Sequence, residues 1–316
     1  MVSVAAPTYI STPCVICGTP GNATELYPST VVDDVFNPEV FSARRAPDRV
    51  HYRMVQCDAC GLVRSDPVAP PELHALLYRD GGFGSAEETA NLARTYGRYL
   101  QRLERHGVHK GALLEVGCAT GFVLDEALDQ GYAQVQGVEP SQVMVAQASP
   151  RVRDAIVCDI LRPGLFPAES FDALCMFQTF DHLPDPAGLL GVCFDVLKPG
   201  GLILLLNHNV TSLSARIMKE RSPIIDLQHT YLFSPETITH LLRVQGYEPL
   251  ETGSVRNDYT LRYLAHLAPL PGVLKAVASA VTAATPLGRI QLSLPLGNLY
   301  AIARKPLAGR HTHAAR

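Results

Sequence analysis

The chain has 316 residues, of which 47% are hydrophobic, and a formal net charge of −3 at pH 7. This length suits one main domain with a small accessory domain. The slight negative charge argues against a broad nucleic-acid-binding surface, and no apolar run approaches the length of a membrane span. We therefore expect a cytoplasmic protein with no transmembrane segment and no nucleic-acid partner.

Two Cys-x-x-Cys pairs, each followed directly by a glycine, lie near the N-terminus; the four cysteines are Cys14, Cys17, Cys57 and Cys60. Four thiolates suit a tetrahedral Zn²⁺ ion, and closed sites of this kind are structural. We therefore expect a zinc-binding module over residues 1–68. Disulfides and a redox-active pair are the alternatives. The first residues show no basic and apolar segments of a secretion signal, which disfavours disulfides.

Residues 69–110 are expected to form a linker and one amphipathic helix. The proline-rich stretch 66–71 predicts the linker, and the glycines of 80–84 predict a turn that closes over a ligand or is an ordinary loop. Apolar and aromatic residues then recur at helical spacing at Leu92, Tyr96, Tyr99 and Leu103. This helix should pack on the edge of the domain that follows.

A short apolar strand at 113–116 runs into a turn that contains Gly117, Ala119 and Gly121, and a helix ending near Gly131 follows. A strand, a tight turn and a helix form a nucleotide cradle, because glycine lets the backbone approach a ligand and the helix N-terminus presents N–H groups. The turn lacks the Gly-x-Gly-x-x-Gly spacing of dinucleotide sites. Glu115 would repel a pyrophosphate but can bind a cationic amino-acid moiety, which favours S-adenosylmethionine.

Acids also follow the next strands. Glu139 ends a strand beginning at 135 and is placed to bind both ribose hydroxyls, whereas Asp159 could reach the adenine amine. Residues 171–177 and 197–206 are continuous apolar runs, typical of buried parallel strands. The predicted cofactor-binding residues are Glu115, Gly117, Cys118, Ala119, Gly121, Glu139, Pro140, Asp159, Ile160, Phe177 and Gln178.

Two further helices and an antiparallel strand pair are expected toward the C-terminus. One helix covers 212–219, and Ser234 caps another, with Pro235 at its first position. The strand pair would comprise 248–255 and 299–304. The apolar insertion between them, about 260–290, would be a substrate lid, a homodimer face, a lipid-facing patch or plain packing. The tail 307–316 is basic and is expected to be disordered.

The ordered motifs resemble those of class I S-adenosylmethionine-dependent methyltransferases over about 110–250, with a weaker continuation to 306. The resemblance is carried by Glu115-x-Gly117-x-x-x-Gly121, Glu139, Asp159, Phe171-Asp172, the segment 181–186 and Leu197-Lys-Pro-Gly-Gly201. It implies an α/β fold, with a Rossmann-like, doubly wound, seven-stranded sheet over 111–306. A doubly wound domain whose glycines serve only tight packing is the alternative.

The cysteine pairs ahead of such a domain are similar to those of sugar C-methyltransferases that act on nucleotide-linked deoxysugars. This resemblance implies methyl transfer to the carbon or oxygen of a small molecule, namely a sugar, a nucleotide-sugar or a secondary metabolite. Those enzymes usually carry a further C-terminal domain of Rossmann type, for which we expect this chain to be too short. A non-catalytic protein that binds the cofactor or a partner, and an RNA methyltransferase, are the alternative functions.

Three histidines are candidates for the base that removes a proton from the acceptor. His182 and His208 follow strands whose carboxyl ends should border the ligand site. In the resembled family the segment of His182 shapes the cofactor pocket and starts a helix, so a structural role is its alternative, and the side chain of His208 faces either substrate or solvent. His229 lies in a segment resembling the His-Glu-His…Tyr-Phe-Ser segment of the sugar C-methyltransferases, although Leu227 and Gln228 replace the first histidine and the glutamate. His229 is our best candidate, with Asp226 or Tyr231 as its orienting partner. A histidine that only caps the following helix is the alternative.

Overall fold

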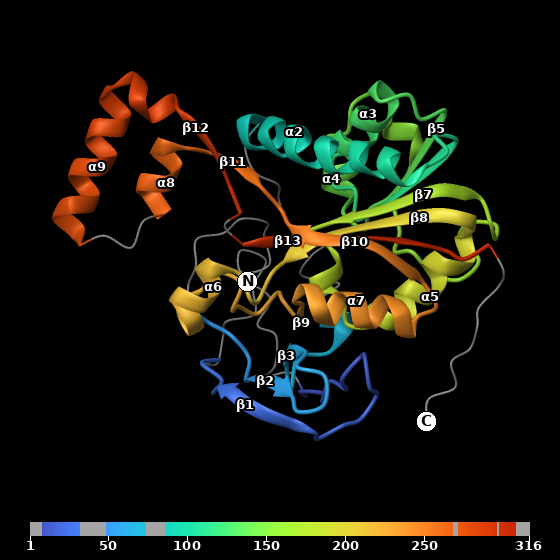
Figure 1. The fold of residues 1–316 in the computed structure, drawn as a ribbon, viewed down its shortest axis with the longest axis horizontal. Coiled ribbons are helices and arrows are strands. Elements are labelled where there is room, and N and C mark those ends of the chain that lie inside the picture. Colours follow the sequence, from blue (N-terminus) through green and yellow to red (C-terminus); the bar gives the residue numbers. More distant parts are fainter. Residues whose placement is uncertain (1–7, 32–48, 74–85, 268–270, 296, 308–316) are drawn as a thin grey trace.

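The computed structural model describes residues 8–31, 49–73, 86–267, 271–295 and 297–307. Its main feature is a seven-stranded sheet, which confirms the predicted fold class (Figure 1). The strands in spatial order are β10 (Glu248–Ser254), β13 (Asn298–Arg304), β8 (Leu197–His208), β7 (Phe171–Phe177), β4 (Ala112–Val116), β5 (Gln134–Val138) and β6 (Ile156–Val157). The five strands from β8 to β6 pair in parallel. Strand β13 is antiparallel to both β8 and β10.

Helices cover both faces of this sheet (Figure 1). On one face lie α2 (Ala86–Arg102), α3 (Phe122–Asp129) and α4 (Gln142–Ala146); on the other lie α5 (Pro186–Val196) and α7 (Pro235–Val244). Alternate residues of β8 enter separate cores: Leu204 joins the α2 and α3 side, whereas Leu205 joins the α5 and α7 side. Because both faces of the sheet are buried, the sequences of the parallel strands are continuously apolar.

The cysteine pairs belong to a smaller sheet, of strand order β1–β2–β3–β9. Strands β1 (Ala23–Tyr27), β2 (Met54–Cys57) and β3 (Val63–Ser65) come from the N-terminal part, whereas β9 (Tyr231–Leu232) comes from the part of the chain that forms the large sheet. Arg64 pairs with Tyr231 in this register. The N-terminal module therefore shares its sheet with the main domain, which the sequence did not indicate.

Short helical segments complete the connections. They are α6 (Leu213–Met218), η1 (Leu103–His106), η2 (Arg153–Ala155), η3 (Phe180–His182) and η4 (Lys219–Arg221). The predicted cap of α7 is confirmed: the Ser234 side chain accepts from the Thr237 N–H, the Thr237 hydroxyl binds the Ser234 backbone, and Pro235 occupies the first turn. These bonds pair buried N–H groups that would otherwise have no partner at the helix end.

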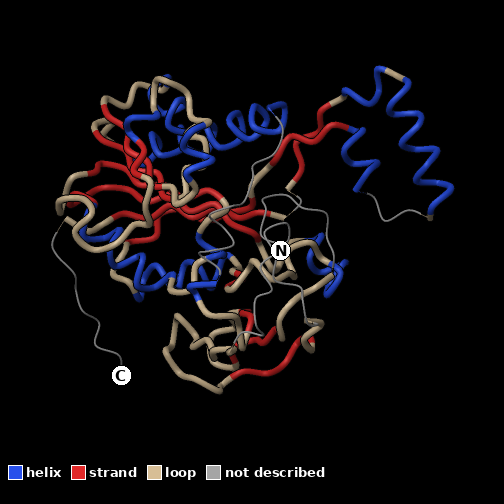
Figure 2. The backbone as a smooth tube through the Cα atoms, turned by 180° about the vertical axis from the view of Figure 1, so that it is seen from behind, coloured by secondary structure: helices blue, strands red, loops and turns tan. Residues whose placement is uncertain are grey.

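The insertion forms a helical arm, which we define as residues Asn257–Leu294. It contains β11 (Asn257–Thr260), α8 (Leu261–Leu267), α9 (Gly272–Ala284), η5 (Pro286–Arg289) and β12 (Gln291–Leu294). Strands β11 and β12 pair as a two-stranded ribbon, and α8 and α9 stand beyond it, away from the large sheet (Figures 1 and 2). Among the described helices, none is long and apolar enough to cross a membrane. The predicted glycine turn at 80–84 and most of the tail lie outside the described residues.

Candidate functional site

The glycine turn after β4 has the geometry that its sequence predicts. Gly117 and Gly121 adopt φ values of +73° and +72°, and Ala119 adopts +49°. The N–H groups of Gly117 and Cys118 donate to the Val138 carbonyl, at 2.8 and 3.2 Å. A Cβ atom at position 117 would lie 2.4 Å from the Thr179 hydroxyl oxygen. Glycine is therefore required here both for its φ and for the close approach of the loop after β7.

Two acids are buried beside this turn. The Glu139 carboxylate accepts from the Ala119 and Ser141 N–H groups, both at 2.9 Å. Glu115 Oε2 is buried and has no hydrogen-bond partner among the described residues. Burial raises the pKa of Glu115 well above its usual range, and the neighbouring Glu139 charge raises it further. Burial also raises the pKa of Glu139. A cationic ligand would stabilise the Glu115 carboxylate, so this residue fits the cationic amino-acid moiety of S-adenosylmethionine, and Glu139 remains a predicted ligand of its ribose hydroxyls.

The remaining predicted cofactor residues line the same sheet edge or flank it. Phe177, the last residue of β7, stacks on Tyr96 of α2 at 4.5 Å between ring centroids. Gln178 follows with φ of +54°, and its N–H donates to the Leu206 carbonyl at 2.7 Å. Asp159 is paired with Arg162 at 3.0 Å. Pro140, Asp159 and Ile160 remain predicted cofactor ligands. Tyr96 was predicted only as part of a helix that packs on the domain, but it is an aromatic neighbour of Phe177.

The three candidate histidines meet at the carboxyl edge of the parallel strands. His182 ends η3, His208 ends β8, and His229 lies just before β9. The His229 ring centroid is 4.4 Å from that of His208 and 4.6 Å from that of His182. We call these residues the histidine cluster. Loops after adjacent parallel strands meet at one sheet edge, which is why positions so distant in sequence are neighbours here.

Each of two histidines in the cluster is paired with a buried carboxylate. Asp181 Oδ2 lies 2.7 Å from His208 Nδ1 and also accepts from the His208 N–H at 3.1 Å. Asp226 Oδ1 lies 2.7 Å from His229 Nδ1 and accepts from the His229 N–H at 3.0 Å. Such pairs orient the imidazole and stabilise its protonated form. Asp226 was predicted; Asp181 was missed, although it precedes the candidate His182.

The electrostatics of the cluster follow from burial and these pairs. Burial alone would raise the pKa of Asp181, but the charges of the cluster histidines, His208 above all, hold it well below its usual range. The pKa of Asp226 is likewise held low, chiefly by His229 against the effect of burial. Burial, reinforced by the His229 charge, lowers the pKa of His182 to about 4. Asp181, His182 and His229 also lie close enough together for a metal ion.

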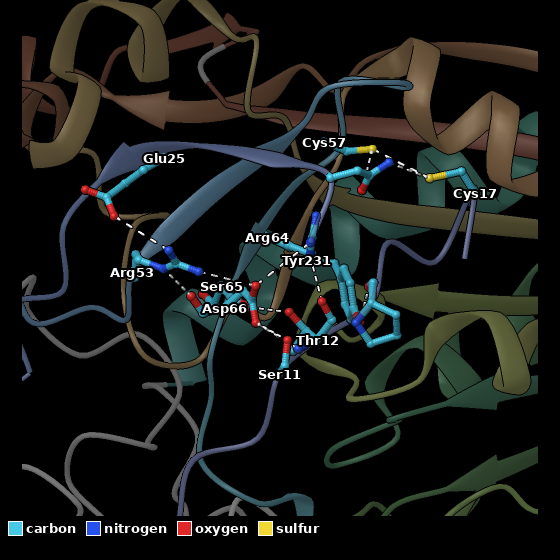
Figure 3. Close-up of polar contacts among 12 residues, drawn as sticks. Ser11, Thr12, Cys17, Glu25, Arg53, Cys57, Arg64, Ser65, Asp66 and Tyr231 are labelled. Carbon is cyan, nitrogen blue, oxygen red and sulfur yellow. Dashed lines mark hydrogen bonds and ion pairs between the residues drawn. The ribbon is translucent and has the colours of Figure 1, made fainter. Parts of the chain in front are cut away.

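Tyr231 does not join the histidine cluster. Its side chain is buried beneath the N-terminal module, where its hydroxyl donates to the Pro13 carbonyl at 3.2 Å (Figure 3). The predicted role of Tyr231 as an orienting partner of His229 is therefore corrected, and Asp226 takes that position. The physical reason is the strand pairing between β3 and β9, which directs this tyrosine toward the module.

The N-terminal module instead contacts the backbone of the segment that carries His229, which we call the His229 loop. The Ser65 hydroxyl donates to the His229 carbonyl at 3.0 Å, and the Ser65 N–H donates to the Thr230 carbonyl at 2.9 Å. The Thr230 N–H in turn donates to the Asp181 carbonyl at 3.0 Å. These three bonds connect β3, the His229 loop and η3 in sequence.

The four predicted metal ligands lie together in this module. Their sulfur atoms are all within 4.8 Å of one another, with Cys14 and Cys60 at 3.4 Å and Cys17 and Cys57 at 3.6 Å. Four thiolates around one zinc ion at normal bond lengths are separated by about 3.8 Å. Burial raises the pKa of the Cys14 and Cys60 thiols, whereas at Cys17 the hydrogen bonds from Thr19 and Asn22 outweigh burial and lower the thiol pKa to about 6. The donor set therefore fits a closed zinc site.

An acid-flanked glycine turn on a sheet of this order, with one antiparallel strand beside β8, defines a class I methyltransferase domain. The chain belongs to the methyltransferase domain family, whose sequence model matches residues 89–252, just over half of its length.

Known proteins agree with this assignment. The ubiquinone biosynthesis O-methyltransferase of Psychrobacter arcticus is 30% identical over 122 residues, which cover 35% of this chain and 47% of that protein. A Mycolicibacterium smegmatis protein named "Probable S-adenosylmethionine-dependent methyltransferase" is 30% identical over 144 residues, covering 44% and 53%. The chain thus spans about half the length of these relatives.

A solved structure supports the fold. In the complex between the Haloferax volcanii Trm112 methyltransferase activator and a methyltransferase, one chain superposes with a TM-score of 0.52 and 19% identity. The superposition covers 72% of this chain and 96% of the other.

The lowered pKa of His182 predicts a loss of stability in mild acid. A free histidine takes up its proton near pH 6.5, whereas folded His182 does so near pH 4. Between these values the unfolded state binds more protons, so the free energy of unfolding should fall by up to about 3 kcal/mol as the pH drops across this window.

Urea denaturation at several pH values measures this effect. We expect His182→Gln to remove this part of the pH dependence, and the exposed His240→Gln to retain it. Parallel stability curves for the wild type and His182→Gln would contradict the assignment.

Proposed function

We propose that this protein transfers a methyl group from S-adenosylmethionine to a hydroxyl or an acidic carbon of a small organic molecule. The carrying observation is the histidine cluster, which holds two imidazole–carboxylate pairs next to the cofactor turn. Thr179 touches the turn at Gly117, and Asp181, the partner of His208, follows two residues later. A proton-accepting group thus lies beside the proposed methyl donor, as acid–base catalysis requires.

The buried acids would hold the cofactor. Glu115 would receive its cationic amino-acid moiety, Glu139 its ribose hydroxyls and Asp159 its adenine amine, with backbone from Gly117 to Gly121 closing around it. When bound, the cofactor supplies an electrophilic methyl group on a sulfonium. The protein contributes alignment of the acceptor, and removal of its proton.

We assign the proton acceptor to His229. Because its Nδ1 faces Asp226, the proton of the acceptor goes to Nε2, and Asp226 stabilises the imidazolium that forms. His229 is almost buried, with 7% of its side chain exposed, whereas His208 is 25% exposed. Neighbouring His208, oriented by Asp181, would pass the proton to solvent. His229, paired with Asp226, would thus accept the proton of the acceptor, and His208, paired with Asp181, would release it to solvent.

The proposed acceptor is a sugar, a nucleotide-sugar or a secondary metabolite. Deprotonation by a histidine suits a hydroxyl or a carbon made acidic by an adjacent carbonyl group. The O-methyltransferase relative from Psychrobacter arcticus supports a hydroxyl acceptor, whereas the cysteine module and the His229 segment support a sugar-type substrate.

We further propose that Cys14, Cys17, Cys57 and Cys60 bind one structural Zn²⁺ ion. The cluster is closed by four thiolates and leaves no position for substrate. Its metal would fix the strands β2 and β3 that contact the His229 loop through Ser65. Zinc would therefore support catalysis through positioning rather than through chemistry.

The first test concerns cofactor binding. Glu139→Ala should weaken S-adenosylmethionine binding by about 1–3 kcal/mol, because it removes the ribose ligand and two bonds that hold the turn. Isothermal titration with S-adenosylmethionine and S-adenosylhomocysteine measures this. The exposed acid Asp129, paired with Arg151, provides the control variant Asp129→Ala. Unchanged affinity in Glu139→Ala would refute the placement, and no binding by the wild type would refute the function.

The second test concerns the base. With an acceptor found by screening nucleotide-sugars and phenols, His229→Gln should lower kcat by about 10²–10⁴-fold at unchanged cofactor affinity. His208→Gln should lose less activity and recover part of it in imidazole buffer, because a small buffer base replaces a proton carrier. Full kcat in His229→Gln would exclude this residue as the base.

The third test concerns the metal. Cys57→Ser should lose the bound zinc, about one ion per chain in the wild type, and lower the melting temperature. Metal analysis and thermal denaturation measure these effects. Cys158→Ser is the matched control, because Cys158 is exposed and remote from the cysteine cluster. A Cys57→Ser protein with full zinc content and an unchanged melting temperature would overturn the structural-zinc proposal.

A further inference from the structure

The helical arm leaves the domain at the sheet edge that carries the histidine cluster. It connects the end of β10 to the start of β13, and Asn298 at that start pairs with His208. Two polar bonds fix its base, from Arg98 to the Arg256 carbonyl and from Arg256 to the Ser293 carbonyl. Beyond the base, α8 and α9 pack on each other and on η5 (Figures 1 and 2).

Helix α9 has the inverse of the usual amphipathic pattern. Its half-buried positions include the polar residues Lys275, Ser279 and Thr282, and Thr282 donates within the helix to the Ala278 carbonyl. Apart from Gly272, its exposed residues are all apolar: Val273, Leu274, Ala276, Val277, Ala280, Val281, Ala283 and Ala284. Val273 is 78% exposed. A helix in water buries such a face, so this face is built to be covered.

The charge of the arm indicates what covers it. The helical arm carries Arg262, Lys275 and Arg289 against the single acid Asp258, a net charge of +2, and its residues 261–290 contain no aspartate or glutamate. Since the whole chain carries −3, the remainder carries −5. The arm is thus a local positive, apolar element on an acidic protein. An anionic surface attracts it, whereas the arm of a second copy carries the same positive charge and is repelled.

We propose that the helical arm docks the protein on the surface of an anionic lipid bilayer. Helix α9, with 13 residues, is too short to span a bilayer and would lie in the interface with its aliphatic face among the acyl chains. Arg289, exposed in η5, and the Lys275 ammonium, at the end of a long flexible side chain, would contact lipid phosphates. Docking there would bring the edge that bears the histidine cluster toward the lipid surface. This proposal does not depend on the proposed reaction.

The experiment is co-sedimentation of the full-length protein with vesicles of phosphatidylcholine alone or mixed with phosphatidylglycerol. We expect binding to the mixed vesicles that weakens as salt is added. Lys275→Gln combined with Arg289→Gln should weaken it by about thirtyfold, the loss of two surface-contacting cations. Val277→Asp combined with Val281→Asp should abolish it. Val244→Asp, at an exposed valine at the end of α7, is the matched control and should bind as the wild type does.

Several results would overturn the proposal. These are no binding of the wild type to mixed vesicles, equal binding to both vesicle types, or undiminished binding by the doubly aspartate-substituted arm. Light scattering after size-exclusion chromatography tests whether a second copy of the chain covers this face instead. If the wild type forms a dimer and does not bind vesicles, and if the Val277→Asp/Val281→Asp protein is a monomer, the face belongs to a dimer interface and the proposal is overturned. Unchanged melting temperatures would show that each variant is folded, as expected for substitutions at exposed positions.

Discussion

The fully buried carboxylate of Asp181 is the charge around which the site is organised. A carboxylate in such a position is costly unless it is paired and hydrogen-bonded. Here its side chain binds both the ring and the backbone of His208, and its carbonyl accepts from Thr230. One residue therefore joins the loop after β7, the end of β8 and the segment that carries His229. The cost of burying the charge is offset by an arrangement that fixes three chain segments.

A different electrostatic situation exists at the cofactor turn. Glu115 and Glu139 are buried with raised pKa values, and Glu115 Oε2 has no partner within the described part of the chain. Asp181 Oδ2 is paired with His208, whereas Glu115 Oε2 would be paired by a cation from outside. The protein thus stores unfavourable electrostatic energy at one site, which a positively charged ligand would release on binding.

Much of the main domain could be predicted because its determinants are local. Apolar runs such as 171–177, the turn at Gly117 and the cap at Ser234 depend on residues a few positions apart. The contacts that complete the site are not local. Ser65 meets His229 across 164 positions, and the two-residue strand β9 is too short to show a periodic pattern. The same pairing turned Tyr231 away from the cluster, which no feature of its own segment indicates.

The sharing of β9 between two parts of the chain has a consequence for biosynthesis. Strands β1 to β3 are complete once residue 65 has been made, but their fourth strand is Tyr231–Leu232. During translation the edge of β3 stays without its partner until residue 232 has been made. Exposed strand edges of this kind favour aggregation and recruit chaperones. The sheet of the N-terminal module can therefore be completed only after all five parallel strands of the large sheet have been made.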